Sequence, residues 1–403
     1  MKSYIATLHV QNVGLFNQLN IQFNPRMNIV IGKNGSGKTS ILRLITYCMS
    51  EATEGLIHSR WRQQAEVWAE TYWKGKHYNS GLSLKEQVNE GYRQMPFSSE
   101  SVFQKNNHRL APNNLYVIGA YRYFDYKRID GMKREAVGAE RKQYYRNHAT
   151  QFLDGTLLPD IKQWMINRYF SIDKDWSEIQ RQNWEHIMGL LPSFAPQEMD
   201  FNFARIERDL EPIFKLNGKE CYLEELASSF LSFLAIVFSI IDWCEGVNEG
   251  IEALMQNALG TVLIDEVDAH LHPEWQTQII EHLKTLFPQI QLIVTSHSPH
   301  VIASAEANEV IKIPPHHGEV NLKPETQSYQ GWQLEVINEE VMNAKVLPTD
   351  IDNMLAQIEK AYSDNDLQSY NAYLTKLATV LHPNDPILKV YKLKKSNLIL
   401  NLE

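Results

Sequence analysis

The chain has 403 residues, of which 43% are hydrophobic and 22% charged, the composition of an ordinary soluble globular protein large enough for two lobes or domains. Its formal net charge of -9 at pH 7 argues against general binding of polyanions, so contact with nucleic acid would need a local basic patch. The three cysteines, Cys48, Cys221 and Cys244, lie far apart without a C-x-x-C pair, which excludes a disulfide framework or cysteine zinc site and indicates a reducing compartment.

The N-terminal residues predict a sheet that leads into a buried strand. Residues 4–10 and 19–23 alternate apolar with polar side chains, as in a half-buried antiparallel pair joined through Gly14. Residues 27–31 form the apolar strand that follows. No signal peptide precedes these strands and no uninterrupted apolar run reaches the length of a membrane span, so we expect a cytoplasmic protein without a membrane partner.

A glycine-rich loop follows the apolar strand and precedes a predicted helix at residues 38–48. Gly32, Gly37, Lys38 and Thr39 fit the pattern G-x-x-x-x-G-K-[ST], in which backbone N–H groups and the positive end of the helix surround a phosphate chain. Lys38 then reaches the β and γ phosphates, and Thr39 gives its hydroxyl to Mg²⁺. The predicted nucleotide-binding residues are Gly32, Asn34, Gly35, Ser36, Gly37, Lys38, Thr39 and Ser40.

The next stretch contains turns, tryptophans and one clear strand. Three tryptophans among polar residues and two turn-like segments predict a short antiparallel sheet within residues 51–110. Residues 115–120 form an apolar strand that ends just before Arg122. Side chains at the carboxyl end of a strand in an α/β sheet often face a ligand, so Arg122 is either a phosphate contact or an ordinary surface arginine.

Residues 122–146 combine basic and aromatic side chains. Eight are Lys or Arg and four are acidic, with five tyrosines or phenylalanines among them. Such a stretch can hold a nucleic acid backbone while the rings stack on bases, although it is more often a solvated helix face or a loop. The candidate phosphate or nucleic-acid contacts are Arg122, Arg128, Lys133, Arg134 and Arg141. Residues 150–214 are expected to be mostly helical, and the absence of a heptad repeat excludes a long coiled-coil arm.

Two further strands in the second half of the chain end in polar residues. Residues 261–264 run into Asp265 and Glu266, and adjacent residues on a strand point to opposite faces, which suits different roles. One carboxylate orients the Mg²⁺ shell, and the other polarises a water aimed at the γ-phosphate. Residues 291–296 end at His297, which can hydrogen-bond a γ-phosphate or the attacking water. A helix beginning at Pro273 connects the two strands, and the His270 and His272 before it lack a third ligand for a metal site.

Three sequence blocks together resemble the ABC-type ATPases of the SMC and RecF group. They are the phosphate loop, Leu-Ile-Asp-Glu-Val-Asp-Ala-His-Leu-His-Pro and Val-Thr-Ser-His-Ser-Pro, and the resemblance covers residues 4–313 in order and spacing. Within that group the chain is similar to compact bacterial ATPases of phage-defence systems, such as the Septu-type ATPases and the ATPase half of the OLD nucleases. The resemblance implies the α/β fold of an ABC-type P-loop NTPase, with a mixed central sheet, an antiparallel N-terminal sheet, a helical insertion and a helical C-terminal tail.

The resemblance also implies ATP and Mg²⁺ as cofactors and assigns roles to individual residues. Catalytic roles are assigned to Lys38, Glu266 and His297, with Glu266 as the general base. Mg²⁺ is assigned to Thr39 and Asp265. The family closes two copies head to tail over two ATP molecules, which implies a homodimer or a higher even oligomer. Asp268 would belong to the loop that crosses this dimer interface.

The signature segment of the family is altered in this chain. Family members have Leu-Ser-x-Gly at the start of a helix that contacts the γ-phosphate of the other copy. The counterpart here lies at residues 226–232, with Ala227 in place of the serine and Ser229 in place of the glycine. Ser228 or Ser229 could cap the helix and offer a hydroxyl to phosphate across the dimer. Loss of the usual hydroxyl predicts slow hydrolysis, or a protein that mainly senses bound ATP.

The expected domain order places lobe I and its phosphate loop in residues 1–50, the rest of lobe I with a helical insertion in 51–215, lobe II in 216–313, and a helical segment in 314–403. OLD nucleases continue at this point into a metal-dependent nuclease domain. Here Asp350 and Asp352 lie at a helix start and not after an apolar strand, so the tail is expected to dock a partner or a second copy.

The sequence therefore predicts an ATPase that gates or activates an effector, such as an HNH nuclease, in antiviral defence. The alternative is a RecF-like clamp for DNA repair, in which ATP-driven closure holds DNA against the basic stretch. A transporter subunit is disfavoured because the spacing between Lys38 and Ser228 is far longer than compact transporter ATPases carry.

Overall fold

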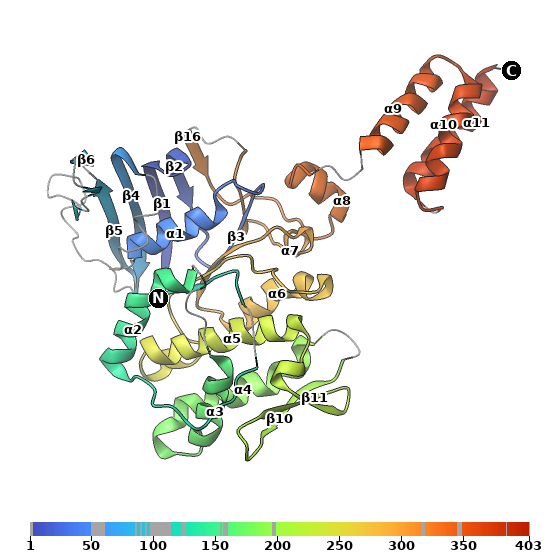
Figure 1. Ribbon diagram of the computed structural model, residues 1–403. Helices are drawn as coiled ribbons and strands as arrows, with labels where there is room; N and C mark the ends of the chain where they lie inside the picture. Colours follow the sequence, from blue (N-terminus) through green and yellow to red (C-terminus); the bar gives the residue numbers. More distant parts are fainter. Residues whose placement is uncertain are drawn as a thin grey trace. The chain divides into compact units, whose positions relative to one another are not determined.

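The structure is a computed structural model of the chain, drawn in Figure 1. It describes residues 3–49, 61–84, 87–88, 91–92, 95–96, 114–122, 126–153, 155, 160–195, 199–315, 319–344, 349–383 and 385–402. The chain divides into two compact units, Met1–Ile337 and Asn338–Glu403.

A six-stranded sheet opens the first unit. Its order is β16-β2-β1-β4-β5-β8, and every pair is antiparallel except β16 with β2. Ile5, Leu8 and Val10 of β1 are buried while their neighbours are partly exposed, which is the alternation expected of a sheet with one covered face. The strands are β1 Tyr4–Val13, β2 Phe16–Gln22, β4 Trp61–Trp73, β5 Lys76–Leu84, β8 Met95–Pro96 and β16 Glu319–Leu322.

The predicted antiparallel N-terminal sheet is therefore confirmed, but its extent was not foreseen. The tryptophan-rich stretch forms β4, which pairs antiparallel with β5 and also with β1, so the antiparallel strands predicted within residues 51–110 extend the N-terminal sheet. A small two-stranded sheet pairs β6 Gln87–Val88 with β7 Gly91–Tyr92.

A five-stranded parallel sheet is the centre of the first unit. Its order is β15-β3-β14-β13-β9, so the strand before the glycine-rich loop lies beside β14, which leads to the predicted histidine, and β14 in turn lies beside β13, which leads to the predicted acids. β3, β9, β13 and β14 are buried along their whole length, as parallel strands covered on both faces must be. The strands are β3 Met27–Ile31, β9 Leu115–Ile118, β13 Thr261–Ile264, β14 Gln291–Thr295 and β15 Val310–Lys312.

These two sheets confirm the predicted α/β class with a P-loop core. The central sheet is parallel throughout, and the single parallel pair of the six-stranded sheet makes that sheet the mixed one. Helix α1, Lys38–Met49, contacts β4 and β5 of one sheet and β9 of the other, so it lies between them as Figure 1 shows.

Helix α5, Ser228–Val247, is the most apolar helix of the unit and packs against β9 and the helices α2, α3, α4 and α6. By length and composition it could span a membrane, with a mean hydropathy of 1.8, although Ser232, Ser239 and Asp242 interrupt its apolar residues. However, 89% of that window is buried inside the fold, as the central helix of a core is. Trp243 and Phe233 of this helix are among the largest fully buried side chains.

The predicted helical insertion is helical only as far as Phe194. Helices α2 Gly138–Leu153, α3 Ile161–Ser171 and α4 Glu178–Phe194 are followed by a three-stranded antiparallel sheet of β10 Phe201–Ile206, β11 Pro212–Leu216 and β12 Lys219–Tyr222. The prediction of helix to residue 214 is therefore wrong. Asn217 and Gly218 have positive φ values of 50° and 74° and join β11 to β12, so the Asn-Gly pair was a hairpin signal that helical reasoning overlooked.

The remaining elements of the first unit are short or connect the sheets. Helix α6, Pro273–Leu286, begins at the predicted proline and contacts α7, Pro299–Ala303. The short elements are η4 Asp175–Ser177, η5 Leu223–Glu225, η6 Gly250–Ala253, α8 Leu334–Val336 and the π-helix η7 Ile337–Val341, which lies at the boundary between the units.

A half-buried histidine in α6, His282, makes stability depend on pH. The His282 ring lies 4.7 Å from the ring of Phe194 and 6.0 Å from that of Phe233, and its buried Nδ1 has no hydrogen-bond partner among the described residues. Burial lowers the pKa of His282 from 6.5 to about 4, partly opposed by Glu281. Between those pH values the unfolded chain binds a proton that the folded chain does not, so stability falls as pH falls.

We expect the free energy of unfolding to decrease by about 1–2 kcal/mol from this histidine between pH 7 and pH 5, allowing for its partial exposure. Urea unfolding at the two pH values should show a smaller loss in His282→Phe than in the wild type. His186→Phe is the matched control, because His186 is hydrogen-bonded to Gln256 near the surface of α4. An equal pH dependence in His282→Phe and the wild type would contradict this account.

The second unit is a three-helix arrangement with its own small core. Helices α9 Thr349–Ser363, α10 Leu367–Val380 and α11 Pro386–Leu402 bury eight residues among themselves, including Ile358, Tyr370 and Leu398. Tyr370 donates a hydrogen bond to the backbone oxygen of Tyr391 at 2.7 Å, which ties α10 to α11. The predicted boundary at residue 314 lies within the first unit, because β16 returns to pair with β2.

Candidate active site at the glycine-rich loop

The glycines of the loop between β3 and α1 are required by its backbone. Gly35 and Gly37 have positive φ values of 76° and 95°, which other residues rarely adopt. A Cβ on Gly37 would lie 2.7 Å from Cζ of Phe16, and a Cβ on Gly32 would lie 2.6 Å from Oγ of Ser36. The loop can therefore curve tightly over β2 and α1 only with glycine at these positions.

The inner side of this loop carries hydrogen-bond donors that the protein itself does not use. The Ser36 hydroxyl is buried and has no partner among the described residues. The first amides of α1 have no acceptor within the helix and lie at the positive end of its dipole. Among the other predicted loop residues, Asn34 is exposed and Ser40 is half-buried. Unused donors of this kind fit a phosphate group.

Lys38 folds back over the loop. Its Nζ donates to the backbone oxygens of Gly32 at 2.9 Å and Lys33 at 3.1 Å, and the residue is only 6% exposed. Burial lowers the pKa of Lys38, and the negative charges of Asp265, Glu266 and Asp268 act in the opposite direction. A buried ammonium group that has only backbone oxygens as partners is well suited to an anionic ligand.

The predicted magnesium ligands are in direct contact. Thr39 donates its hydroxyl to Oδ2 of Asp265 at 2.9 Å, although the two residues are 226 positions apart. Thr295, at the end of β14, donates to Oδ1 of the same carboxylate at 2.6 Å. Thr295 is not among the predicted site residues, although its position at the end of a buried strand, two residues before His297, is a signal that the sequence contains. Mg²⁺ needs few protein ligands when phosphate oxygens supply the others.

No larger metal site accompanies this pair. Among the residues that the structure describes, no three His, Cys, Asp or Glu side chains gather closely enough to hold a metal ion. Nδ1 of His272 instead accepts a hydrogen bond from the amide of Glu274 at 3.5 Å and caps α6.

Glu266 is held in an uncommon backbone conformation beside the loop. β13 ends at Ile264, so both acids lie beyond the strand, and the predicted alternation of side chains on a strand does not separate them. The left-handed backbone of Glu266, with φ of 48°, separates them instead. Its amide donates to Oγ1 of Thr295 at 2.7 Å, and the next amide, of Val267, donates to the backbone oxygen of Thr295 at 2.9 Å.

His297 follows β14 and faces the same charges. Its amide donates to Oδ1 of Asp268 at 3.4 Å, which brings the predicted switch histidine and the predicted interface loop together. Burial lowers the pKa of the His297 imidazole and the positive charge of Lys38 lowers it further, while Asp268, Glu266 and Asp265 oppose both effects. The imidazole is therefore neutral near pH 7 and able to accept or donate one hydrogen bond.

The structure contradicts the predicted capping role of Ser228 and Ser229, which are the first two residues of α5. Ala227 is the N-cap residue and no side chain caps the helix. Ser229 is 8% exposed, donates to the backbone oxygen of His270 at 3.2 Å and accepts from the amide of His272 at 3.0 Å. Ser228 is exposed, and its hydroxyl lies 3.5 Å from the oxygen of His270. The serines therefore hold the loop after Glu266, and the first amides of α5 stay open.

Both interpretations of Arg122 are wrong, because the residue is only 6% exposed and its donors are all used within the protein. Nε donates to Oγ of Ser232 at 3.1 Å, and the two terminal nitrogens donate to four backbone oxygens. Arginine has five N–H donors, so none remains for a phosphate. The acceptors are the backbone oxygens of Gly119, Asp265, Glu266 and Ala269.

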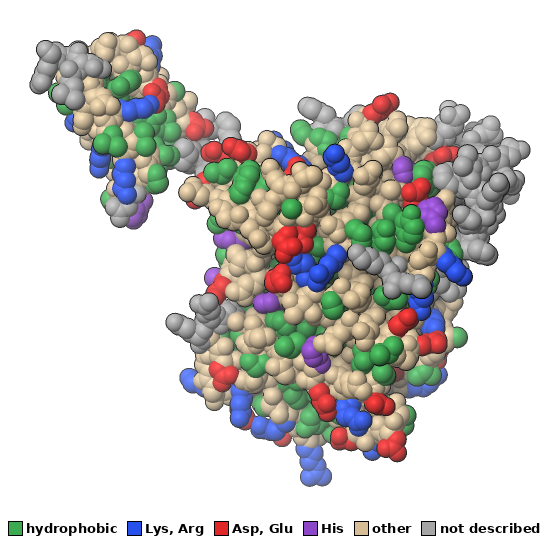
Figure 2. All heavy atoms as spheres, turned by 180° about the vertical axis from the view of Figure 1, so that it is seen from behind, with side chains coloured by type: hydrophobic (Ala, Val, Ile, Leu, Met, Phe, Trp, Pro, Cys, Tyr) green, Lys and Arg blue, Asp and Glu red, His purple; other side chains and the backbone are tan. Residues whose placement is uncertain are grey.

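The basic stretch does not form one basic surface. The prediction that Arg141 contacts nucleic acid is wrong, because its side chain is only 11% exposed and donates to Asp242 inside the helical region. Arg134 and Arg128 are exposed, but each lies beside a carboxylate, Glu140 at 2.7 Å and Asp130 at 3.7 Å. Lys133 is exposed. Figure 2 shows acidic and basic side chains interspersed on the face that it presents. Tyr123 and Phe124 lie outside the described residues.

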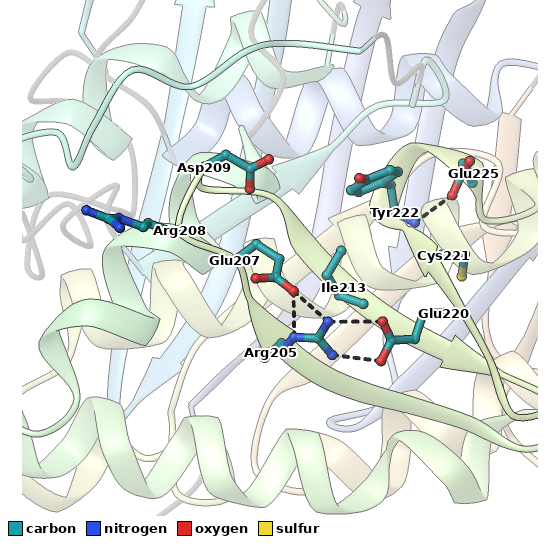
Figure 3. A pocket seen from close by; sticks show the side chains of 9 residues that line it. All are labelled: Arg205, Glu207, Arg208, Asp209, Ile213, Glu220, Cys221, Tyr222 and Glu225. Atoms are coloured by element: carbon teal, nitrogen blue, oxygen red, sulfur yellow. Dashed lines mark hydrogen bonds and ion pairs between the residues drawn. The ribbon is translucent and has the colours of Figure 1, made fainter.

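A cavity of about 530 Å³ lies away from these residues, on the three-stranded sheet before α5. Figure 3 shows Arg205 between Glu207 and Glu220, with hydrogen bonds of 2.7 Å to the first and 2.7 and 3.0 Å to the second. None of the predicted site residues lines this cavity. Its lining residues are Arg205, Glu207, Arg208, Asp209, Ile213, Glu220, Cys221, Tyr222 and Glu225.

Comparison with known proteins agrees with this geometry. A family model described as an AAA domain matches residues 7–227, and one described as an AAA ATPase domain matches residues 153–302. The chain is 28% identical to the Septu protein PtuA of Bacillus thuringiensis over 97% of both chains. This match confirms the resemblance predicted from the three sequence blocks.

Two other similar proteins cover less of the chain or are more distant. The chain is 30% identical to the Retron Ec83 probable ATPase of Escherichia coli, over 36% of this chain and 25% of that protein. The SMC head domain from Thermotoga maritima covers 80% of this chain and 98% of that chain, with 15% identity and a TM-score of 0.43.

Proposed function

Because the chain belongs to the AAA domain family of ATPases, we propose that it binds ATP with Mg²⁺ at the loop between β3 and α1 and hydrolyses it. The observation that carries this proposal is the hydrogen-bonded sequence from Thr39 through Asp265 to Thr295. It joins the phosphate loop to the ends of β13 and β14, where the candidate base and the candidate switch histidine lie. A structural role alone would not need a buried lysine and an unused buried serine hydroxyl in the same loop.

The residues of the site divide the chemistry among them. Lys38 and the loop amides bind the β and γ phosphates, and Thr39 with Asp265 would hold Mg²⁺, which when bound neutralises phosphate charge. The Glu266 carboxylate accepts a proton from water as the water oxygen bonds to the γ-phosphorus and the bond to the bridging oxygen breaks. His297 donates a hydrogen bond to the γ-phosphate, or donates one to that water or accepts one from it.

The proposed active form is a homodimer, or a higher even oligomer, closed by ATP. The open amides at the start of α5 and the exposed hydroxyl of Ser228 suit a phosphate presented by a second copy, and the half-buried Asp268 lies in the adjacent loop. Because Ala227 replaces the signature serine and the hydroxyl of Ser229 is occupied within the chain, we expect hydrolysis to be slow, below about 1 s⁻¹ against a typical enzyme rate of about 10 s⁻¹.

The proposed biological role is to gate an effector, such as an HNH nuclease, in cytoplasmic antiviral defence. Support comes from the full-length similarity to a protein named Septu PtuA and the partial similarity to a protein named as a retron ATPase. The second unit, Asn338–Glu403, has its own core and is the proposed docking element for the effector. A nuclease or reverse transcriptase gene beside this one would support the role, and a permease gene would support a transporter subunit instead.

Metal removal tests the proposed chemistry. We expect the purified chain to release phosphate from ATP in the presence of Mg²⁺, to stop when EDTA removes the metal, and to recover when Mg²⁺ is added in excess. A nonhydrolysable ATP analogue with Mg²⁺ should raise the sedimentation coefficient to that of a dimer. The proposal is contradicted if saturating ATP and Mg²⁺ give neither phosphate release nor binding of the analogue.

A further inference from the structure

Arg122 occupies the space between three elements that meet behind the candidate base. It follows β9, and its guanidinium reaches the turn after β13 and the first half of α5. Its terminal nitrogens donate to the backbone oxygens of Glu266 at 2.7 Å, Asp265 at 3.1 Å and Ala269 at 3.2 Å. One side chain thus binds three carbonyl groups of a five-residue turn, Asp265 to Ala269, which we call the acid turn.

The acid turn needs such a partner because of its own conformation. Glu266 within the turn has a φ of 48° and His270, directly after it, a φ of 66°, both in the left-handed region that costs free energy for residues other than glycine. Three of its carbonyl groups, those of Asp265, Glu266 and Ala269, accept from Arg122 at buried or partly buried positions, where a carbonyl group needs a donor. Burial lowers the pKa of Arg122 to about 10, opposed by Asp268, Asp265 and Glu266, so the guanidinium stays protonated at neutral pH.

The same guanidinium connects the acid turn to α5. Nε of Arg122 donates to Oγ of Ser232 at 3.1 Å, and Ser232 donates to the backbone oxygen of Ala269 at 3.2 Å. Ser229, three residues earlier on α5, donates to the oxygen of His270. The start of α5 and the backbone of Glu266, the candidate base, are therefore linked by a continuous set of hydrogen bonds.

We propose that Arg122 is a positioning residue for ATP hydrolysis, which holds the acid turn so that the Glu266 carboxylate faces the γ-phosphate and which links that turn to α5. This inference rests on the proposed function and deepens it. Arg122 touches no substrate atom, because its donors are all used within the protein. When the guanidinium N–H donors of Arg122 are removed, the acid turn changes conformation. The rate of the chemical step then falls, while the phosphate loop still binds ATP.

The test compares two buried arginines in the full-length chain. Arg122→Lys keeps the positive charge but cannot donate to all of these acceptors at once. Arg168→Lys is the matched control, because Arg168 is 3% exposed and its donors go to Glu245 and Glu135 in the helical region. We expect Arg122→Lys to lower kcat at least tenfold and to change the Kd of a fluorescent ATP analogue less than twofold. Arg168→Lys should lower Tm and keep kcat, measured well below its Tm.

Hydrogen exchange adds a readout that a general loss of stability does not reproduce. Amides of the acid turn should exchange faster in Arg122→Lys than in Arg168→Lys, while those of β3 and α1 keep their wild-type rates. The proposal is overturned if Arg122→Lys keeps wild-type kcat, or if Arg168→Lys loses kcat to the same extent. If the wild type itself hydrolyses no ATP, the proposed function fails and not this inference alone.

Should Arg122→Lys fail to fold, a milder pair of variants carries the test. Ser232→Ala removes one acceptor of Arg122 and leaves the guanidinium in place, and Ser239→Ala is its control on the same helix, where Ser239 is 2% exposed. A decrease in kcat of about threefold in Ser232→Ala, with unchanged KM and without a similar decrease in Ser239→Ala, supports the proposal. Equal kcat values in the two variants overturn it.

Discussion

Replacing Lys38 with alanine is expected to abolish nucleotide binding. The ammonium group is buried in the glycine-rich loop, where, among the residues that the structure describes, it donates to the backbone oxygens of Gly32 and Lys33 alone. Hydrogen bonds to charged groups contribute about 1.5–3 kcal/mol each, so loss of two phosphate contacts should raise the Kd for ATP at least about a hundredfold. Titration with a fluorescent ATP analogue in the presence of Mg²⁺ measures this change.

The same loop provides the control for Lys38→Ala. Lys33 is exposed, and Lys33→Ala should leave the Kd nearly unchanged. Burial lowers the pKa of Lys38, so its charge is poorly compensated before the nucleotide binds. Thermal unfolding without nucleotide should therefore give Lys38→Ala a Tm no lower than that of the wild type. Unchanged binding of the analogue by Lys38→Ala would remove the loop from the nucleotide site.

Replacing Glu266 with glutamine is expected to trap ATP and to stabilise the dimer. Glutamine keeps the shape of the side chain and leaves the bond from the backbone amide to Thr295, but it cannot accept the proton of the attacking water. General base catalysis contributes about a hundredfold to ten-thousandfold, so kcat should fall by that factor while ATP still binds. Phosphate release measures kcat, and sedimentation velocity with ATP measures the dimer.

A control variant at another glutamate distinguishes the loss of the general base from the loss of one negative charge. Glu274 lies in the first turn of α6 and is exposed, so Glu274→Gln removes one negative charge near the site without touching the acid turn. It should turn over ATP at the wild-type rate and return to monomers as ATP is consumed. Normal turnover by Glu266→Gln would exclude Glu266 as the base.

Sequence patterns located those parts of the candidate site that depend on residues close together in the chain. The glycine-rich loop, the strand before it and the helix after it are consecutive, and their turn chemistry and hydrophobic pattern depend on neighbouring residues. The acids after β13 and the histidine after β14 were found in the same way, since parallel buried strands place their carboxyl ends at one edge. The Asn-Gly hairpin between β11 and β12 was an equally local signal that the expectation of helix concealed.

Side-chain burial was beyond the reach of the sequence. Arg122 and Arg141 belong to the same basic stretch as Arg128 and Arg134, yet Arg122 is buried and the Arg141 side chain is only 11% exposed, whereas the other two are exposed. The partners of Arg141 and Arg122, Asp242 and the backbone of the acid turn, are about a hundred or more positions away in the chain. All four arginines lie in one stretch of the same charge and composition. Only the packing of distant elements against it distinguishes the first pair from the exposed pair.

By itself the sequence determined the phosphate loop, the paired acids, the late histidine and the α/β class, because each depends on residues close together in the chain. Only the tertiary structure decided that Thr295 is hydrogen-bonded to Asp265, that Arg122 holds the acid turn and that the two serines at the start of α5 do not cap the helix. The physical reason is that a hydrogen bond needs its donor and acceptor within about 3 Å, and the packing of distant strands and helices sets which groups meet.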